Sequence, residues 1–351
     1  MEAALSIIGW LMIAATVLPL LRSEHWIVRI FDFPRLQITV VFCVTFAAYL
    51  AVREDPSQAD NLFLGILAGC LAYQLWRMWP YTPLHSKQVK TVVESDDSRS
   101  LSLLISNVLE TNRDSGKLLA LIRRFDPDLV LLVETDDWWL EQLRELERTH
   151  AHVLQQPQAN TYGMLLYSRY PLLDPQVRFL VQDDVPSIDT GVRLPSGDRV
   201  WLRGVHPRPP APGESTRSTE RDAELMVVAK ELQNADRPSI VVGDLNDVAW
   251  SHTNALFQKI SRLLDPRVGR GFYSTFNANW PFIRFPLDHA FVSRHFRVAA
   301  FEVLPHMGSD HFPVFARLTL SPATAADANA APPAASAGDE KEAQTKITRA
   351  T

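Results

Sequence analysis

Three long apolar runs in the first eighty residues constrain this chain more than any other feature. The first run covers residues 3–21 and is interrupted only by Ser6, Gly9, Thr16 and Pro19. As a helix that rises about 1.5 Å per residue it reaches about 28 Å, which nearly spans the core of a bilayer. A signal peptide is the alternative, and it is disfavoured because the usual positively charged segment is missing and a second apolar run follows.

The second and third runs cover residues 36–52 and 62–76. The third is the weakest, because it is short and contains Gln74, and the aromatic residues that follow it suit a membrane interface. Together the runs predict an all-α transmembrane module of about three helices over residues 1–80, in a multi-pass protein of the cell membrane. The third run is alternatively an interfacial helix or a buried helix of a soluble domain.

Basic residues near the runs predict an orientation. Arg22, Arg29 and Arg35 lie in the first connection, whereas the second connection contains only Arg53. With three spans, the first connection shares one side of the membrane with the large C-terminal part, and its excess of Arg predicts that side to be the cytoplasm. If the third run does not cross, the C-terminal part lies on the other side.

Composition excludes some classes of protein. With 46% hydrophobic and 21% charged residues, a chain of 351 residues can bury a sizeable core in one or two domains. The net charge of −5 argues against a broadly basic surface that coats nucleic acid, although it leaves room for a local basic groove. Cys43 and Cys70 lie in apolar runs, which indicates core or lipid-facing thiols rather than a disulfide or a metal pair.

From about residue 90 the pattern becomes that of an α/β domain. Buried strands are predicted at residues 101–106 and 129–133, and a helix over residues 216–233 leads into a strand that begins at Ser239. The strands predict one domain over residues 98–320.

Two segments flank this domain. Residues 81–97 are predicted to link it to the membrane module. Residues 321–351 consist of Ala, Pro, Thr and charged residues without an aromatic, so they predict a disordered tail.

The stretch over residues 239–247 contains a short buried strand that ends where polar side chains begin. Because side chains alternate along a strand, Asp244 and Asn246 share one face while Leu245 turns toward the core. An acid and an amide side by side at a strand end suit the activation and orientation of a water molecule. The alternative is a strand that runs into an Asn/Asp turn.

Polar side chains lie at the ends of the other predicted strands as well. Each alone fits a turn former, a helix cap or a satisfied histidine. Their number at strand ends predicts one common site instead. They are Asn107, Glu134, His206, Asp288, His289, Ser309, Asp310 and His311.

The order of these motifs resembles the endonuclease/exonuclease/phosphatase superfamily, which includes deoxyribonuclease I, abasic-site endonucleases, inositol polyphosphate phosphatases and bacterial sphingomyelinases. The resemblance covers about residues 98–320 and implies a deoxyribonuclease I-like fold, a four-layer α/β sandwich of two packed sheets flanked by helices. The motifs that carry it are Ser106-Asn107-Val108, Val133-Glu134-Thr135, Tyr162-Gly163, Ser168-Arg169-Tyr170-Pro171, Val205-His206-Pro207, Gly243-Asp244-Leu245-Asn246, Leu287-Asp288-His289 and Ser309-Asp310-His311.

The resemblance also implies roles for the site residues. The metal ligands are Asn107, Glu134 and Asp310, whose hard oxygen atoms favour Mg²⁺ or Mn²⁺. Asp244 is implied to orient or deprotonate the attacking water, with Asn246 holding the phosphate or the metal-bound water.

Histidines complete the implied site. His311, hydrogen-bonded to Asp288, is implied to contact the phosphate in the transition state, because a nearby carboxylate favours the imidazolium. His206 is implied to assist with phosphate or leaving-group charge.

These features predict a membrane-anchored, divalent-metal-dependent phosphoesterase that hydrolyses phosphodiester bonds, either a nuclease or a hydrolase of phospholipids or other small phosphodiesters. The predicted partners are the bilayer and a phosphodiester substrate, nucleic acid or phospholipid headgroup, and no protein partner is predicted. The alternative is a non-catalytic membrane protein that binds a phosphorylated ligand or partner in the same cleft.

Two groups of residues near the late motifs bear on the substrate. Trp280, Phe282 and Phe285 suit stacking on a base, insertion into lipid, or the core, and the core is the default interpretation. Nearby arginines, among them Arg267 and Arg284, predict a solvated surface rather than a groove for nucleic acid.

Overall fold

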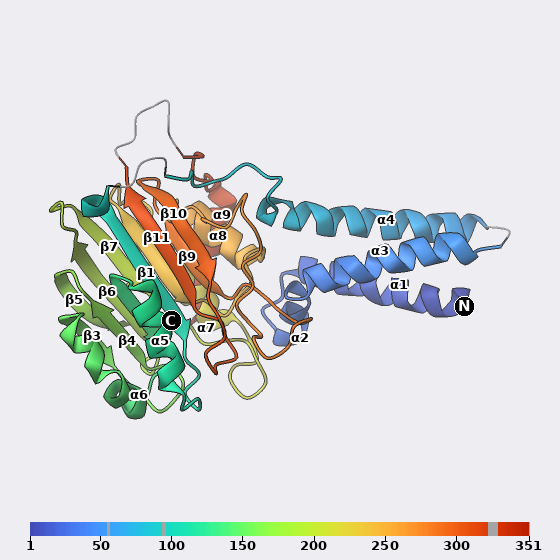
Figure 1. Cartoon of the computed structure of the whole chain (residues 1–351). Coiled ribbons are helices and arrows are strands. Elements are labelled where there is room, and N and C mark those ends of the chain that lie inside the picture. The colour runs from blue at the N-terminus through green and yellow to red at the C-terminus, as the bar shows by residue number, and fades with distance from the viewer. Residues whose placement is uncertain (55–56, 93–95, 322–328, 351) are drawn as a thin grey trace.

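The computed structural model describes residues 1–54, 57–92, 96–321 and 329–350. A long helical arm projects from an α/β body, as Figure 1 shows. The arm is built from the N-terminal apolar runs, and the body contains both β-sheets.

Three helices form the arm: α1 (Glu2–Val17), α3 (Arg35–Val52) and α4 (Gln58–Met78). With the short turns at their ends, the segments Glu2–Leu21, Arg35–Val52 and Gln58–Tyr81 are each long and apolar enough to cross a membrane. Large apolar side chains lie exposed along all of them. The third helix begins earlier than its apolar run because Ser57 and Asp60 form a capping box.

The connection between the first two spans folds onto the body. It contains the short helix α2 (Trp26–Arg29) and a 3₁₀ turn over Ile30–Asp32. The backbone amide of Trp26 donates to the carbonyl of Thr216 at 3.1 Å. The indole Nε1 of Trp250 donates to the carbonyl of Asp32 at 2.7 Å. The first connection and the body therefore lie at the same end of the arm (Figure 1).

Two mixed sheets form the body. The first has six strands in the order β10-β11-β1-β2-β4-β3 and the second has five in the order β5-β6-β7-β8-β9. The strands of the first sheet are β1 (Ser100–Asn107), β2 (Leu129–Val133), β3 (His152–Gln156), β4 (Met164–Ser168), β10 (Phe296–Val303) and β11 (Val314–Leu320). Those of the second are β5 (Leu172–Phe179), β6 (Pro186–Arg193), β7 (Arg199–Gly204), β8 (Ser239–Asp244) and β9 (Asp288–Val292).

The core lies between the two sheets, where Leu103, Leu131, Leu202, Ile240 and Val242 belong to one buried cluster. Helices cover both outer faces. The first sheet packs against α5 (Ser115–Phe125) and α6 (Asp137–Gln142), and the second against α7 (Thr219–Leu232) and α8 (His252–Ser261). This arrangement confirms the predicted four-layer sandwich.

The C-terminal segment differs from its predicted disorder. Helix α9 (Ala337–Ala350) packs Ala343 against the α7 and α8 layer. Lys346 Nζ donates to Asp222 at 2.8 Å, and Lys230 of α7 pairs with Glu340. The prediction of disorder is wrong for this helix. The prediction rested on the low apolar content of the segment, whereas charge pairs with α7 hold the helix in place. Residues 322–328 of the predicted tail lie outside the described residues.

Candidate active site

The ends of four strands bring the predicted site residues to one edge of the sandwich. β1 and β2 are parallel neighbours, and Asn107 lies opposite Val133 in their register. Asn107 and Glu134, which follows Val133, therefore lie at the same edge of the sheet. β8 and β9 are antiparallel, and Asp244 lies directly opposite Asp288 in their register. The sheet pairing thus places acids that are far apart in the sequence next to each other.

A chain of Asp288, His311 and Asp244, joined by one hydrogen bond and one ion pair, is the centre of this site. Nδ1 of His311 donates to Oδ2 of Asp288 at 2.8 Å, and its Nε2 lies 3.5 Å from Oδ2 of Asp244. Burial alone lowers the pKa of an imidazole, but the two carboxylates outweigh it and raise the pKa of His311 to about 10. His311 is therefore an imidazolium at neutral pH.

Two hydrogen bonds hold Asp244 in place. Its Oδ1 accepts the backbone amide of Asn246 at 2.9 Å, and its Oδ2 accepts Nδ2 of Asn107 at 3.1 Å. Burial raises the pKa of Asp244 to about 6, although the positive charge of His311 opposes this shift. The carboxyl is ionised at neutral pH and close enough to its pKa to accept a proton.

The predicted metal ligands lie beside this centre. Nδ2 of Asn107 donates to Oε1 of Glu134 at 2.7 Å, and Glu134 and Asp310 line the same cavity as Asp244. Burial, with the charges of Asp244 and Asp310, raises the pKa of Glu134 to about 7, although Asn107 and His311 lower it. A divalent cation fits this crowded set of hard oxygen donors.

The geometry also offers a different group of potential ligands. Ligand atoms of Asp244, Asp288 and His311 all lie within 4.8 Å of one another, which makes this buried cluster a possible metal site. With no cation bound, the two carboxylates raise the pKa of His311, and its imidazole would have to lose that proton to bind a metal. The cluster as it stands is an ion-pair network.

His206 faces Asp244 from the end of β7. Its Nε2 lies 3.8 Å from Oδ2 of Asp244, and its ring packs against Tyr162. Burial lowers the pKa of His206 to about 3, and repulsion by His311 adds to this, so the imidazole is neutral. Its Nδ1 and Oδ1 of Asp288 are buried without a hydrogen-bond partner among the described residues. Unpaired buried polar atoms are rare, and these two lie in the site itself.

Several site residues have backbone conformations that are unfavourable for most residue types. Glu134 and Asn246 have φ of 59° and 51°, in the left-handed region that few residues other than glycine adopt. Gly243 has φ of 142°, and a Cβ there would lie 1.9 Å from the carbonyl oxygen of Val205. Only glycine lets β8 approach the end of β7 closely enough to bring Asp244 beside His206.

The structure adds residues that the sequence analysis did not single out. Asp247 is fully buried and accepts Oγ of Ser251 at 2.6 Å. It pairs with Arg29 of α2 and with Arg221 of α7, each at 3.4 Å. Arg221 also donates to the backbone carbonyl of Asn246 at 2.7 Å. Asp247 follows Asn246 directly, so its place next to the Gly243–Asn246 motif was the one sequence signal that it belongs near the site.

Two neighbours of the site motifs have structural roles. His289 is buried behind Asp288, where Nε2 meets the carbonyl of Asp247 at 2.8 Å and Nδ1 faces Arg267 at 2.6 Å. Arg267 is itself buried and pairs with Asp265 at 2.8 Å. The prediction of a solvated surface is therefore wrong for Arg267.

A cavity of about 550 Å³ opens from the site. Its polar floor contains Asp244, Asn246, Asp310 and His311, whereas its walls are mostly apolar. The residues of the walls come from the α2 connection, from the proline-rich loop after His206 and from the loop before Asp288. They are Trp26, Arg29, Ile30, Phe33, Pro34, Pro209, Pro210, Ala211, Pro212, Phe276, Ile283, Phe285 and Leu287.

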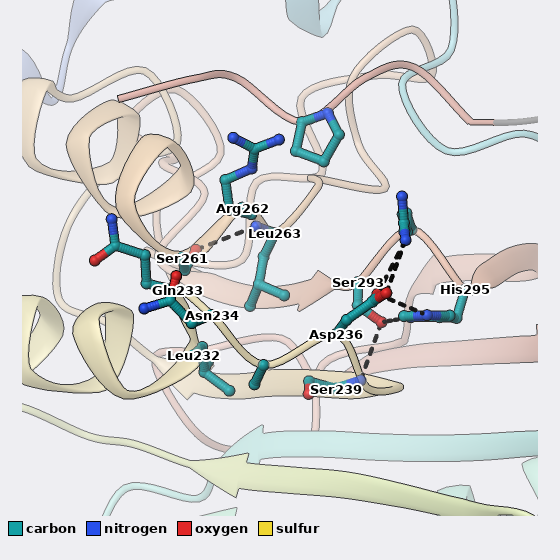
Figure 2. A pocket seen from close by; sticks show the side chains of 13 residues that line it. Leu232, Gln233, Asn234, Asp236, Ser239, Ser261, Arg262, Leu263, Ser293 and His295 are labelled. Atoms are coloured by element: carbon teal, nitrogen blue, oxygen red, sulfur yellow. Dashed lines mark hydrogen bonds and ion pairs between the residues drawn. The ribbon is translucent and has the colours of Figure 1, made fainter. Parts of the chain in front are cut away.

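A second cavity, of about 270 Å³, lies at the opposite end of β8, beside Ser239 (Figure 2). Asp236, which lines it, pairs with Arg294 at 3.0 Å and lies 3.4 Å from the imidazole of His295. The predicted site residues do not line it. The chemistry therefore belongs to the first cavity.

Comparison with known proteins identifies the family. Residues 104–311 match the endonuclease/exonuclease/phosphatase family, and the chain belongs to this family. The resemblance drawn from the motifs is thereby confirmed. A search of curated proteins found no match.

Solved structures share the fold. The human Nocturnin catalytic domain with bound sulfate anion is 18% identical over 64% of this chain and 95% of its own, with a TM-score of 0.53. An endonuclease/exonuclease/phosphatase from Beutenbergia cavernae DSM 12333 is 20% identical over 64% and 72%, with a TM-score of 0.50. D. rerio TDP2 complexed with single strand DNA product is 17% identical over 63% and 99%, also at 0.50.

Proposed function

We propose that this protein is a membrane-anchored, divalent-metal-dependent hydrolase of phosphodiester bonds. The observation that carries the proposal is the buried chain of Asp288, His311 and Asp244, which combines a charged imidazolium with an ionised carboxylate at the floor of one cavity. Membership of the family and the three apolar helices support it.

Asp244 and His311 take complementary roles in this proposal. Asp244 orients the attacking water and accepts its proton, for which a pKa of about 6 is well matched. His311 is held by Asp288 through Nδ1, and its Nε2, which lies 3.5 Å from Asp244, faces the place of the phosphate beside that carboxylate. Its charge stabilises the negative charge that grows on the phosphate. Asn246, which lines the cavity, orients the phosphate.

His206 is proposed to act as a neutral group. Its pKa of about 3 keeps the imidazole uncharged at neutral pH, so it orients the leaving oxygen by a hydrogen bond rather than by charge. Tyr162 holds the ring from the side.

Glu134 and Asp310, with Asn107, would hold the divalent cation. The cation neutralises the non-bridging oxygens of the phosphate when bound. Burial and, less strongly, the charges of Asp244 and Asp310 raise the pKa of Glu134, and a bound cation would favour its carboxylate form. Asn107 turns its amide nitrogen toward Glu134 and Asp244, so it acts first as the residue that holds both acids in place.

Anchoring in the membrane rests on the arm. Its three helices have the length and composition of spans, and their outward side chains are apolar, for example Ile7, Val44 and Leu62 at 61%, 63% and 67% exposure. We place the body on the cytoplasmic side, because the basic first connection lies against it. Nucleic acid and phospholipid are both candidate substrates, the former because D. rerio TDP2 was solved with a DNA product.

The test is hydrolysis of bis(p-nitrophenyl) phosphate by the full chain in detergent. We expect turnover with Mg²⁺ or Mn²⁺, loss of turnover in excess chelator, and recovery when the metal is restored. Asp244→Asn should lower kcat by about 10²-fold or more. Asp174→Asn, on the exposed part of β5, is the matched control and should have no effect.

Each failure has a meaning. Full activity in chelator contradicts the metal-dependent mechanism. Absence of turnover on any phosphodiester, together with binding of a phosphorylated ligand that His311→Ala abolishes, favours the non-catalytic alternative.

A further inference from the structure

We propose that the substrate of this site is a phosphodiester lipid taken from the bilayer that holds the arm. Its phosphate lies at Asp244 and His311, and its hydrocarbon chain lies against the apolar walls of the cavity. This inference rests on the proposed function and narrows the substrate class of the same site.

The N-terminal connection builds one wall of the cavity. Ile30 and Phe33 lie between the first two spans, outside the residues 104–311 that match the family. The ring of Phe33 packs edge-on against Phe285 with the ring centres 5.7 Å apart, so this wall is continuous with the loop before Asp288. The cavity thus has an apolar wall that belongs to the membrane-proximal part of the chain.

With a divalent cation held by Glu134 and Asp310, the charge of the cavity would fit one phosphate and would not fit a polyanion. Among the described residues that line it, Arg29 is the one Lys or Arg side chain. Arg29 is buried and already paired with Asp32 at 3.0 Å and with Asp247 at 3.4 Å. A groove for a nucleic acid strand combines several cations along the backbone with aromatic platforms. This lining has aromatic side chains but lacks the cations.

The loop over residues 277–284 places the mouth of the cavity at the membrane surface. Nε2 of Gln37, in the first turn of the second span, donates to the backbone carbonyl of Phe282 at 2.9 Å. Trp280, Phe282 and Ile283 are exposed at 62%, 85% and 49%. Bulky apolar and Trp side chains are stabilised at the interface between lipid and water.

Exposed residues of α2 and of the 3₁₀ turn after it continue the same apolar surface. Ile27 and Ile30 are exposed at 52% and 50%, and Ile30 also lines the cavity. In Figure 1, α2 lies between the arm and the body. A lipid that enters here moves from one apolar environment to another, while only its headgroup phosphate reaches the polar floor.

The reaction is a hydrolysis. The oxygen of water forms a bond to phosphorus and one bond from phosphorus to an esterified oxygen breaks. Asp244 accepts one proton of the water as this bond forms, and that proton is passed on to the leaving oxygen. The other proton of the water stays on the phosphomonoester product or passes from it to solvent.

The test compares three substrates with the full chain and Mg²⁺: phosphatidylglycerol and phosphatidylcholine in mixed vesicles, soluble bis(p-nitrophenyl) phosphate, and a single-stranded oligonucleotide. We expect release of phosphorylated lipid products, measured by mass spectrometry, at least 10-fold faster than cleavage of the oligonucleotide. The double variant Trp280→Ser/Phe282→Ser should slow lipid hydrolysis at least 10-fold. It should leave turnover of the soluble diester within 2-fold, because neither side chain lines the cavity.

A matched control separates interfacial binding from general loss of an apolar side chain. Phe179→Ser removes an exposed aromatic from β5, away from the cavity, and should change neither rate. Soluble turnover without lipid turnover, faster cleavage of the oligonucleotide, or equal effects of the double variant on both rates would overturn the inference. Loss of soluble turnover in the wild type would instead contradict the proposed function.

Discussion

The buried carboxyl of Glu224 makes the stability of the body depend on pH. Glu224 lies on α7 and is 2% exposed, and its Oε1 accepts Oγ of Ser187 on β6 at 2.8 Å. Burial raises the pKa of Glu224 from 4.5 to about 7 in the folded protein, and the bond from Ser187 opposes this only in part. Among the described residues, the carboxyl has no charged partner to offset its loss of hydration.

The sign and size of the effect follow from linkage. Below pH 4.5 both the folded and the unfolded chain bind the proton. Between pH 4.5 and 7 only the folded chain holds it, so the free energy of unfolding falls by about 1.4 kcal/mol per pH unit. Above pH 7 both forms are ionised, and the folded protein is less stable by about 3 kcal/mol than it is with a neutral Glu224.

Replacement of Glu224 by Gln removes the ionisation and keeps the hydrogen-bond acceptor. We expect Glu224→Gln to match the wild type near pH 4.5 and to be more stable by about 3 kcal/mol at pH 8.5. The assay is urea unfolding of the full chain in detergent, followed by tryptophan fluorescence at several pH values. Glu302→Gln, on the exposed side of β10, is the matched control. Parallel stability curves for the wild type and Glu224→Gln would refute the reasoning.

Three further predictions concern the arm and the site. Arg29→Ala should destabilise the body by about 3 to 5 kcal/mol in urea unfolding, because it leaves Asp247 with one cation fewer in a buried network, and an unchanged midpoint would contradict this. Gly243→Ala should abolish turnover and lower solubility because its Cβ meets the Val205 carbonyl, whereas Gly65→Ala, where a Cβ meets open space, should leave both unchanged. Protease added to intact cells should spare the body, and cleavage from outside would reverse the proposed orientation.

The strand-end motifs were predictable because they depend on residue type and order. Asp244 and Asn246 share a face through the alternation of a strand, which is a local rule. Their meeting with Asp288 and His311 is not local, since it requires the antiparallel register of β8 and β9. The order of the motifs along the chain does not by itself predict this strand register. It did so only because the order resembles that of a known family.

The aromatic residues before Asp288 illustrate what composition cannot decide. Phe285 is buried at 8% exposure, as the default interpretation of a core residue predicts. Phe282 and Trp280 are exposed, although they are equally apolar. Burial depends on which surface a loop meets, and the sequence does not encode that surface within the loop.

The sequence by itself determined the apolar spans, the strands and the acids and histidines at their ends, because hydropathy and alternation are properties of short windows. The tertiary structure decided how distant segments meet. Arg29 reaches Asp247 across the join of arm and body, Phe33 closes the wall of the cavity, and α9 holds to α7 by Lys346. Such contacts arise from long-range packing and from charge pairing in a buried environment, and neither leaves a local pattern in the chain.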